Sequence, residues 1–221
     1  MTSFDAEELF WKNISTVEDA RSKIIWGAHT LEDFNKSTDK EVEFIKNILE
    51  LTRDDVVLDY GCGIGRLMKA LSPYVKHVVG LDVSNAMIVH SKKYLENNKN
   101  VTAMYCSTLA ESPVALRSVN NIYSFIVLQH INKYKVLHIL KNLKNYLAPG
   151  GLGLFQLPDL LKDKGAYKEY ADMYVHNQDN NCSLHFWTKD EAKYIFELAG
   201  WKVVDIIDDE KWSTDMWVLA E

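Results

Sequence analysis

The stretch from Val56 to Arg66, VVLDYGCGIGR, constrains the fold more than any other part of this sequence. Three apolar residues lead into Asp59, and glycines then alternate at positions 61, 63 and 65. An apolar run that ends in alternating glycines predicts a buried strand, a tight turn and a helix. Glycine gives such a turn backbone freedom and leaves space for a ligand against the main chain. We therefore expect a small molecule to bind across this turn.

The charge beside the turn narrows the choice of ligand. The dinucleotide fingerprint G-x-G-x-x-G places a pyrophosphate on a helix N-terminus, but here the third glycine comes one residue early. Asp59 would repel a pyrophosphate by a few kcal/mol at an effective dielectric constant of about 20, and it would attract a cation. A positively charged nucleoside without phosphates satisfies both conditions, and S-adenosylmethionine (SAM) is such a ligand.

The chain resembles the class I SAM-dependent methyltransferases in several segments that follow the family's order. The matching segments are VLDYGCGIGR (57–66), VVGLDVSNAMI (78–88), NNIYSFIVLQHI (120–131), LAPGGLGLFQLP (147–158), AGWKVVDII (199–207) and WSTDMWVLAE (212–221). The resemblance implies an α/β fold, a Rossmann-like doubly wound seven-stranded sheet with a C-terminal antiparallel strand pair and an N-terminal helical extension. It also implies SAM as the cofactor.

The resemblance further implies which residues bind SAM. In the family the glycine turn shapes the methionine side, and an acid at the position of Asp82 holds the two ribose hydroxyls. The cofactor-binding set carried over to this sequence is Asp59, Gly61, Cys62, Gly63, Asp82, Val83, Met87, Thr108, Leu109, Ser124 and Phe125. The family often has acids at the position of Asn120 and near Ser107, the latter on the adenine amino group. Here the adenine contact would fall to Ser107, Thr108 or a backbone amide.

Alternating strand and helix patterns predict a mainly parallel sheet with helices on both faces. We expect strands at 55–60, 77–82, 100–105, 121–127 and 151–156, and helices at 39–51, 64–72, 84–97, 133–147 and from Thr188 to Gly200. Ser84 is a candidate N-cap, and Thr188 with Glu191 forms a candidate capping box. A length of 221 residues suits a helical extension or lid at 1–50 and a methyltransferase domain at 51–221.

Residues 157–187 do not follow the alternation and are rich in polar and aromatic side chains. They follow the fifth strand, at the sheet edge where ligands of open α/β sheets bind. In the resembling family an insertion here builds the acceptor pocket, often with the N-terminal segment as a lid. The resemblance thus implies Trp26, Tyr174 and His185 as acceptor contacts. A plain surface loop is the alternative. Trp11 could close over the cofactor or simply pack on the core.

His130 is the candidate catalytic residue and a further acceptor contact. It follows the fourth strand, and a histidine titrates near neutral pH. Methyl transfer depends mainly on alignment, which can contribute roughly 7–11 kcal/mol. A base is needed only where the acceptor must lose a proton early. The alternative is that His130 caps a helix or hydrogen-bonds within the core.

Composition restricts the partners. The net charge of −6 and the lack of a basic block disfavour a nucleic-acid partner. Cys62, Cys106 and Cys182 have no disulfide or metal-site spacing, so we expect no metal and a reducing compartment. The first residues do not form a signal peptide, and no apolar run approaches the ~20 residues that span a bilayer. We expect a cytoplasmic monomer or homodimer without membrane contact.

The sequence thus predicts a SAM-dependent methyltransferase that acts on oxygen or nitrogen of a small molecule. A natural product, a sugar or a surface-polysaccharide precursor is the expected acceptor class. Two alternatives remain. One is a protein or tRNA methyltransferase, although acidity disfavours tRNA and no N-P-P-Y-like tetrapeptide follows the fourth strand. The other is a non-catalytic SAM-binding partner subunit.

Overall fold

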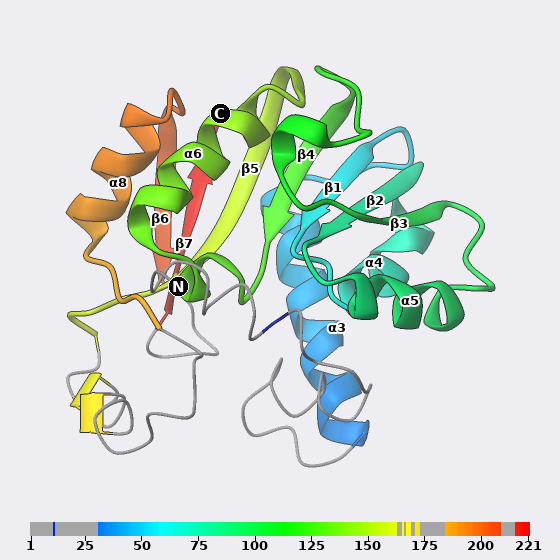
Figure 1. The fold of residues 1–221 in the computed structure, drawn as a ribbon, viewed down its shortest axis with the longest axis horizontal. Coiled ribbons are helices and arrows are strands. Elements are labelled where there is room, and N and C mark those ends of the chain that lie inside the picture. Colours follow the sequence, from blue (N-terminus) through cyan, green and yellow to red (C-terminus); the bar gives the residue numbers. More distant parts are fainter. Residues whose placement is uncertain are drawn as a thin grey trace.

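A seven-stranded sheet in the order β3-β2-β1-β4-β5-β7-β6 forms the centre of the protein (Figure 1). The computed structural model describes residues 11, 31–162, 165, 167–168, 171–172, 184–208 and 215–221. The first five strands are parallel, and β7 runs antiparallel to both β5 and β6. The strands are β1 Val56–Tyr60, β2 His77–Asp82, β3 Val101–Tyr105, β4 Val119–Ser124, β5 Leu147–Pro158, β6 Val203–Asp208 and β7 Asp215–Ala220. The predicted Rossmann-like sheet with its C-terminal antiparallel pair is confirmed.

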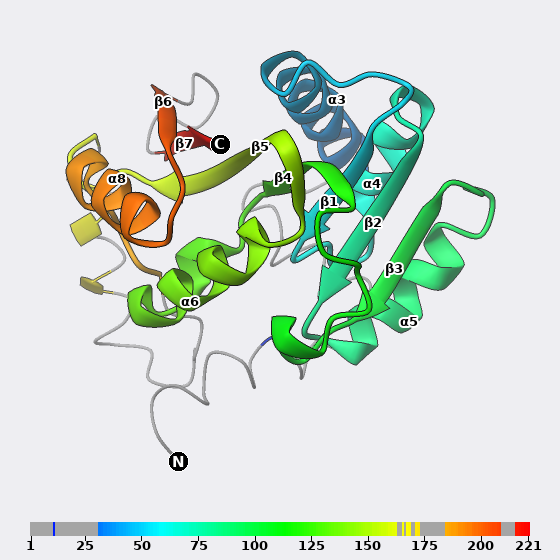
Figure 2. The same cartoon turned by 90° about the horizontal axis from the view of Figure 1, so that it is seen from above.

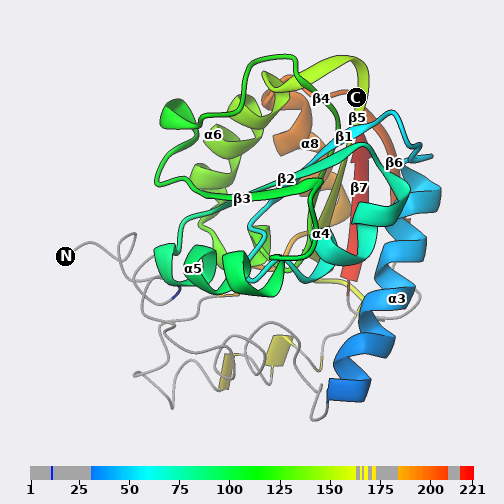
Figure 3. The ribbon, with the colours of Figure 1, turned by 90° about the vertical axis from the view of Figure 1, so that its right-hand side faces the viewer.

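Helices cover both faces of the sheet (Figure 2). Helices α3 Leu31–Ile48, α4 Arg66–Leu71 and α5 Asn85–Tyr94 lie on one face, and α6 Lys133–Lys144 and α8 Lys189–Leu198 lie on the other. The first turns of α3 project past the edge where the parallel strands end (Figure 3). In the described part of the chain, no helix combines the length and the apolar character needed to cross a membrane.

Each face has its own apolar core. Strand residues such as Leu58 and Ile122 pack with α6 and α8, whereas Val57 and Tyr123 pack with α3, α4 and α5. Because successive strand residues point to opposite faces, a strand covered on both sides must be apolar at nearly every position. The short apolar runs in the sequence are therefore buried strands.

The predicted limits of β4 and β5 were wrong at both ends of each strand. We expected strands at 121–127 and 151–156, but β4 spans Val119–Ser124 and β5 spans Leu147–Pro158, so β5 begins where a helix was expected to end. The β4–β5 register passes from Val119↔Leu147 to Asn121↔Leu152, so β5 carries extra residues. Gly150, with φ of 82°, accommodates this irregularity. A Pro-Gly-Gly run predicts a turn, but Leu147 and Leu152 pair with β4 on either side of it, so the run lies within β5 as an irregularity.

The helix before the sheet also differs from its expected limits, because α3 begins at Leu31 and ends at Ile48 rather than spanning 39–51. Both predicted N-caps are confirmed, since Ser84 accepts a hydrogen bond from Met87 N and Thr188 accepts one from Glu191 N. A capping box also requires the Glu191 carboxylate to accept a hydrogen bond from the Thr188 backbone N–H, and it does not do so here. It pairs instead with Lys133 Nζ at 2.7 Å and so joins α8 to α6.

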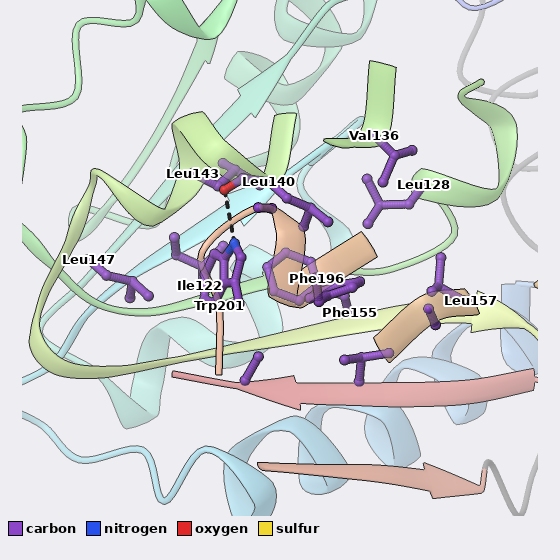
Figure 4. Packing of buried hydrophobic residues seen from close by; sticks show 14 of the residues in the cluster. Ile122, Leu128, Val136, Leu140, Leu143, Leu147, Phe155, Leu157, Phe196 and Trp201 are labelled. Carbon is purple, nitrogen blue, oxygen red and sulfur yellow. Dashed lines mark hydrogen bonds between the residues drawn. The ribbon is translucent and has the colours of Figure 1, made fainter. Parts of the chain in front are cut away.

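Trp201 is a central residue of the core beneath α6 and α8 (Figure 4). Its indole N–H donates to the carbonyl oxygen of Leu140 at 2.9 Å, and only 2% of the residue is exposed. Its ring meets Phe155 edge-on with the centroids 5.2 Å apart. A Cβ at Gly153 would lie 2.6 Å from the same ring, so β5 needs a glycine at that position.

We predict that Trp201→Ala lowers the free energy of unfolding by about 3–5 kcal/mol, because it opens a cavity and removes the partner of a carbonyl group. Urea denaturation followed by circular dichroism measures the change. Tyr194→Ala is the control, since Tyr194 lies on α8 with 64% exposure and should change stability by no more than about 0.5 kcal/mol. Equal effects of the two substitutions would contradict the role assigned to Trp201.

Candidate active site

A cavity of about 480 Å³ lies where the carboxyl ends of β1, β2, β3 and β4 meet. The loops after these strands form its wall, as expected for ligand sites of open α/β sheets. The predicted cofactor residues that line it are Asp59, Gly61, Cys62, Gly63, Asp82, Val83, Met87, Thr108, Leu109 and Phe125. The fold thus brings together residues that lie as far as 66 positions apart in the printed sequence.

The glycine turn is held tightly between two neighbouring strands. The N–H groups of Gly61 and Cys62 both donate to the carbonyl oxygen of Leu81, at 2.8 and 3.1 Å. Gly61 has φ of 81°, and a Cβ there would lie 2.3 Å from Val127 Cγ2. A side chain at position 61 is therefore excluded by both backbone conformation and space. The main chain remains open to a ligand in the cavity.

Asp82 fixes the turn from the end of β2. One carboxylate oxygen accepts the Gly63 N–H at 2.8 Å, and the other accepts the Ser84 N–H at 2.7 Å. Burial raises the pKa of Asp82, and these two N–H donors oppose the rise. Each oxygen of a carboxylate has a second lone pair, so Asp82 can still accept hydrogen bonds from a ligand. The geometry suits a pair of hydroxyl donors.

Asp59 is a buried carboxylate in the wall of the cavity, with 3% of the residue exposed. Burial raises the pKa of Asp59 to about 7, and the nearby Asp82 adds to the rise. The Tyr123 hydroxyl donates to Asp59 Oδ2 at 2.8 Å. This hydrogen bond and the charge of Arg66 both act to lower the pKa of Asp59. A cationic ligand beside Asp59 would favour its ionised form.

Sequence reasoning missed Arg66, which follows the glycine turn and lines the cavity. Its buried guanidinium forms an ion pair with the Glu41 carboxylate and donates to Thr38 Oγ1 at 2.9 Å. It also lies 5.5 Å from the centre of the Phe125 ring. These contacts tie α3 to the cavity wall and place a cation there that can take a ligand carboxylate. Its position directly after the glycines was the one signal available in the sequence.

The segment after β3 and helix α6 form another part of the cavity wall. Ser107 and Thr108 line it, and the backbone there is fixed by Cys106 N, which donates to Asp82 O at 2.9 Å. Sequence reasoning missed Ile131, which precedes α6, and the α6 residues Lys135, His138, Ile139 and Asn142. A helical pattern identifies its core-facing residues, but only packing decides which others face a cavity.

His130 lines the same cavity at the end of the short helix Leu128–His130. Only 7% of the residue is exposed, and its backbone N–H donates to Val127 O at 2.9 Å. Its ring lies 5.0 Å from the ring of Trp11, centre to centre, and Trp11 also lines the cavity. His130 and the glycine turn therefore line the same cavity.

Two other predicted residues lie off the cavity wall. Ser124 is buried and donates its hydroxyl to Tyr60 O at 2.9 Å. His185 donates its backbone N–H to Gln129 O at 2.7 Å, which joins the end of the 157–187 insertion to the loop after β4. Trp26 and Tyr174, the remaining acceptor candidates, lie outside the described residues. Within the described part of the chain, no three His, Cys, Asp or Glu side chains could hold a metal ion together.

The buried Asp59 leads to a prediction for the ligand-free protein. Its folded-state pKa of about 7 lies above the unfolded value of about 3.9. Between these values the unfolded state releases a proton that the folded state keeps, so stability contributed by this group falls as pH rises. We expect the stability gained by Asp59→Asn to grow from about pH 4 and to level off above about pH 7.

Urea denaturation of wild-type and variant protein at several pH values measures this difference. Asp54→Asn, at an exposed acid in the turn before β1, is the matched control. A stability difference for Asp59→Asn that does not change with pH would contradict the raised pKa.

Comparisons with known proteins agree with this geometry. Residues 33–206 match the family described as "Methyltransferase domain". N-terminal Xaa-Pro-Lys N-methyltransferase 1-B of Xenopus laevis is 27% identical over 75% of this chain and 74% of its own. Malonyl-[acyl-carrier protein] O-methyltransferase of Marinomonas sp. is 24% identical over 83% of this chain and 79% of its own.

The fold has a close counterpart among solved structures. A SAM-dependent methyltransferase from Leishmania major superposes with a TM-score of 0.72 and 17% identity, over 99% of this chain and 82% of that one. The cavity residues fit such a cofactor, because the lining includes a turn with glycines at 61 and 63, the Asp82 carboxylate with lone pairs to spare, and the buried acid Asp59. The chain belongs to the methyltransferase domain family and is a SAM-dependent methyltransferase.

Proposed function

We propose that this enzyme transfers the methyl group of SAM to oxygen or nitrogen of a small-molecule acceptor beside His130. The observation that carries the proposal is that one cavity contains the glycine turn, Asp82 and His130. Because its lining is largely apolar, with Trp11 and Phe125 among its aromatic members, water can be excluded from the reacting groups. The same proposal assigns roles to the residues that line the cavity.

The cavity wall supports one orientation of the cofactor. Asp59 and the glycine turn bind the methionine end, where Arg66 can hold the carboxylate and Asp59 the ammonium group. Asp82 accepts the ribose hydroxyls, with Val83 and Met87 packed alongside. Ser107, Thr108 and Leu109 enclose the adenine. Arg66 and Asp59 thus carry charges opposite to those of the ligand carboxylate and ammonium group that they bind.

The reaction then requires alignment more than acid–base chemistry. When bound, SAM supplies a methyl group already activated by a sulfonium, so the transfer is an in-line displacement. Phe125, Val127 and Trp11 confine the acceptor, and positioning of this kind contributes roughly 7–11 kcal/mol. An acceptor hydroxyl or ammonium loses its proton to His130, which lies within the cavity wall.

A second candidate function is methylation of the α-amino group of a protein N-terminus. It is favoured by the similarity to the Xenopus N-terminal N-methyltransferase, which extends over about three quarters of both chains. An α-amine and a small-molecule amine present the same reacting group, and His130 would take the proton from either. Methylation of small amines, sugars and phenols, compared with peptides that begin Xaa-Pro-Lys, distinguishes the two candidates in an assay of S-adenosylhomocysteine release.

We predict that Asp82→Asn weakens binding of S-adenosylhomocysteine by tenfold or more, because hydrogen bonds to a charged group contribute about 1.5–3 kcal/mol each. Asp82 also holds the glycine turn, so the loss must be separated from a distorted loop. An analogue that lacks both ribose hydroxyls provides the control, and the variant should lose much less affinity for it. Equal losses for the two ligands in calorimetric titration would contradict ribose binding.

His130→Asn should lower the rate by about 10²–10⁴-fold with the best acceptor of the panel, if His130 accepts a proton. The loss should shrink as pH rises, because the acceptor then ionises without help. His90→Asn is the matched control, since His90 lies on α5 and away from the cavity lining. A mutant-to-wild-type rate ratio that does not change with pH would exclude the base role and leave alignment.

A further inference from the structure

Ile126 has an unusual backbone conformation beside the cavity. It follows β4, lines the cavity and has φ of 56°. A β-branched residue rarely adopts this left-handed conformation, which is disfavoured by about 1–3 kcal/mol. Such a conformation persists only where the surrounding structure enforces it. The question is which contact enforces it here.

The side chain of Gln156 supplies that contact from the neighbouring strand. The Ile126 N–H donates to Gln156 Oε1 at 3.1 Å, and Gln156 is fully buried in β5. The other end of the amide, Nε2, donates to Asp215 Oδ2 at 3.0 Å, at the start of β7. Because an ionised aspartate only accepts hydrogen bonds, Asp215 fixes the NH₂ group toward itself and the carbonyl toward Ile126.

The segment that Gln156 holds forms a large part of the cavity wall. We call residues 125–130 the β4 loop. Val127 of this loop packs beneath the glycine turn, 2.3 Å from where a Gly61 Cβ would be. The carbonyl oxygen of Val127 also accepts the His130 N–H at 2.9 Å. A change at Ile126 would therefore move both the support of the glycine turn and the base candidate.

We propose that Gln156, oriented by Asp215, is a positioning residue that keeps the β4 loop in the left-handed turn required for cofactor binding. Gln156 does not line the cavity, so it acts through Ile126 rather than through contact with SAM or the acceptor. The proposal depends on the SAM-dependent activity alone. Its test uses S-adenosylhomocysteine, so it can fail or succeed independently of the acceptor class proposed above.

The first test removes Gln156 Oε1, which accepts the hydrogen bond from Ile126 N–H, without adding a charge. Gln156→Met keeps the length of the side chain but leaves the Ile126 N–H without its partner. We expect about five- to tenfold weaker binding of S-adenosylhomocysteine in calorimetric titration, the equivalent of one hydrogen bond. Amide hydrogen exchange should also become faster at Ile126 itself. Wild-type affinity in a folded Gln156→Met protein would overturn the proposal.

The second test exchanges the charge between the two positions. Gln156→Glu sets a carboxylate against Asp215, so affinity should fall at neutral pH and recover at lower pH, where the two acids share a proton. When Asp215→Asn is added to Gln156→Glu, the carboxylate at position 156 accepts a hydrogen bond from the amide group at position 215. The double variant should bind within about threefold of wild type and restore protection of the Ile126 amide.

The charge exchange also decides the outcome if Gln156→Met does not fold. A folded double variant that fails to recover affinity would overturn the proposal, because the hydrogen bond to Ile126 is then present without its effect. Asp215→Asn alone puts a group that both donates and accepts where the aspartate only accepts, so the Gln156 amide is no longer fixed in one orientation. This variant should bind S-adenosylhomocysteine more weakly than wild type, though less weakly than Gln156→Glu. Wild-type affinity with unchanged protection of the Ile126 amide would contradict the orienting role of Asp215.

Discussion

The Asp82 carboxylate joins the two loops on which the whole site depends. Its oxygens accept N–H groups from Gly63 in the glycine turn and from Ser84 at the start of α5. With the carbonyl of Leu81, it holds the turn after β1 against the end of β2. This arrangement requires β1 and β2 to be adjacent and parallel, since only then do their carboxyl ends meet. The same carboxylate keeps lone pairs for a ligand.

Contacts from more distant elements complete the cavity around the two loops that Asp82 joins. Tyr123 of β4 reaches Asp59, and Glu41 of α3 reaches Arg66. Both contacts occur between buried groups, so removing one partner would leave a buried charge or hydroxyl without compensation. The resulting charge distribution, with two acids and one paired cation near the glycine turn, suits a ligand that carries both an ammonium and a carboxylate.

The cavity wall beside His130 is mostly apolar, and the β4 loop and Trp11 contribute to it. Relatives of similar identity have different acceptors by name, a protein N-terminus in one and a malonyl-carrier protein in another. A shared scaffold can serve different reactions, because binding residues often lie on the loops that it positions.

The sequence by itself determined the class of sheet, the glycine turn and the acids near the carboxyl ends of β1 and β2. These features depend on neighbours along the chain, such as the apolar run before Asp59 or the Ser84 cap. Tertiary structure alone decided the partners of Arg66, the bond from Tyr123 to Asp59 and the contact of Gln156 with Ile126. The last two join residues 64 and 30 positions apart. No local pattern encodes such pairs, because they arise only when strand order and register place the side chains together.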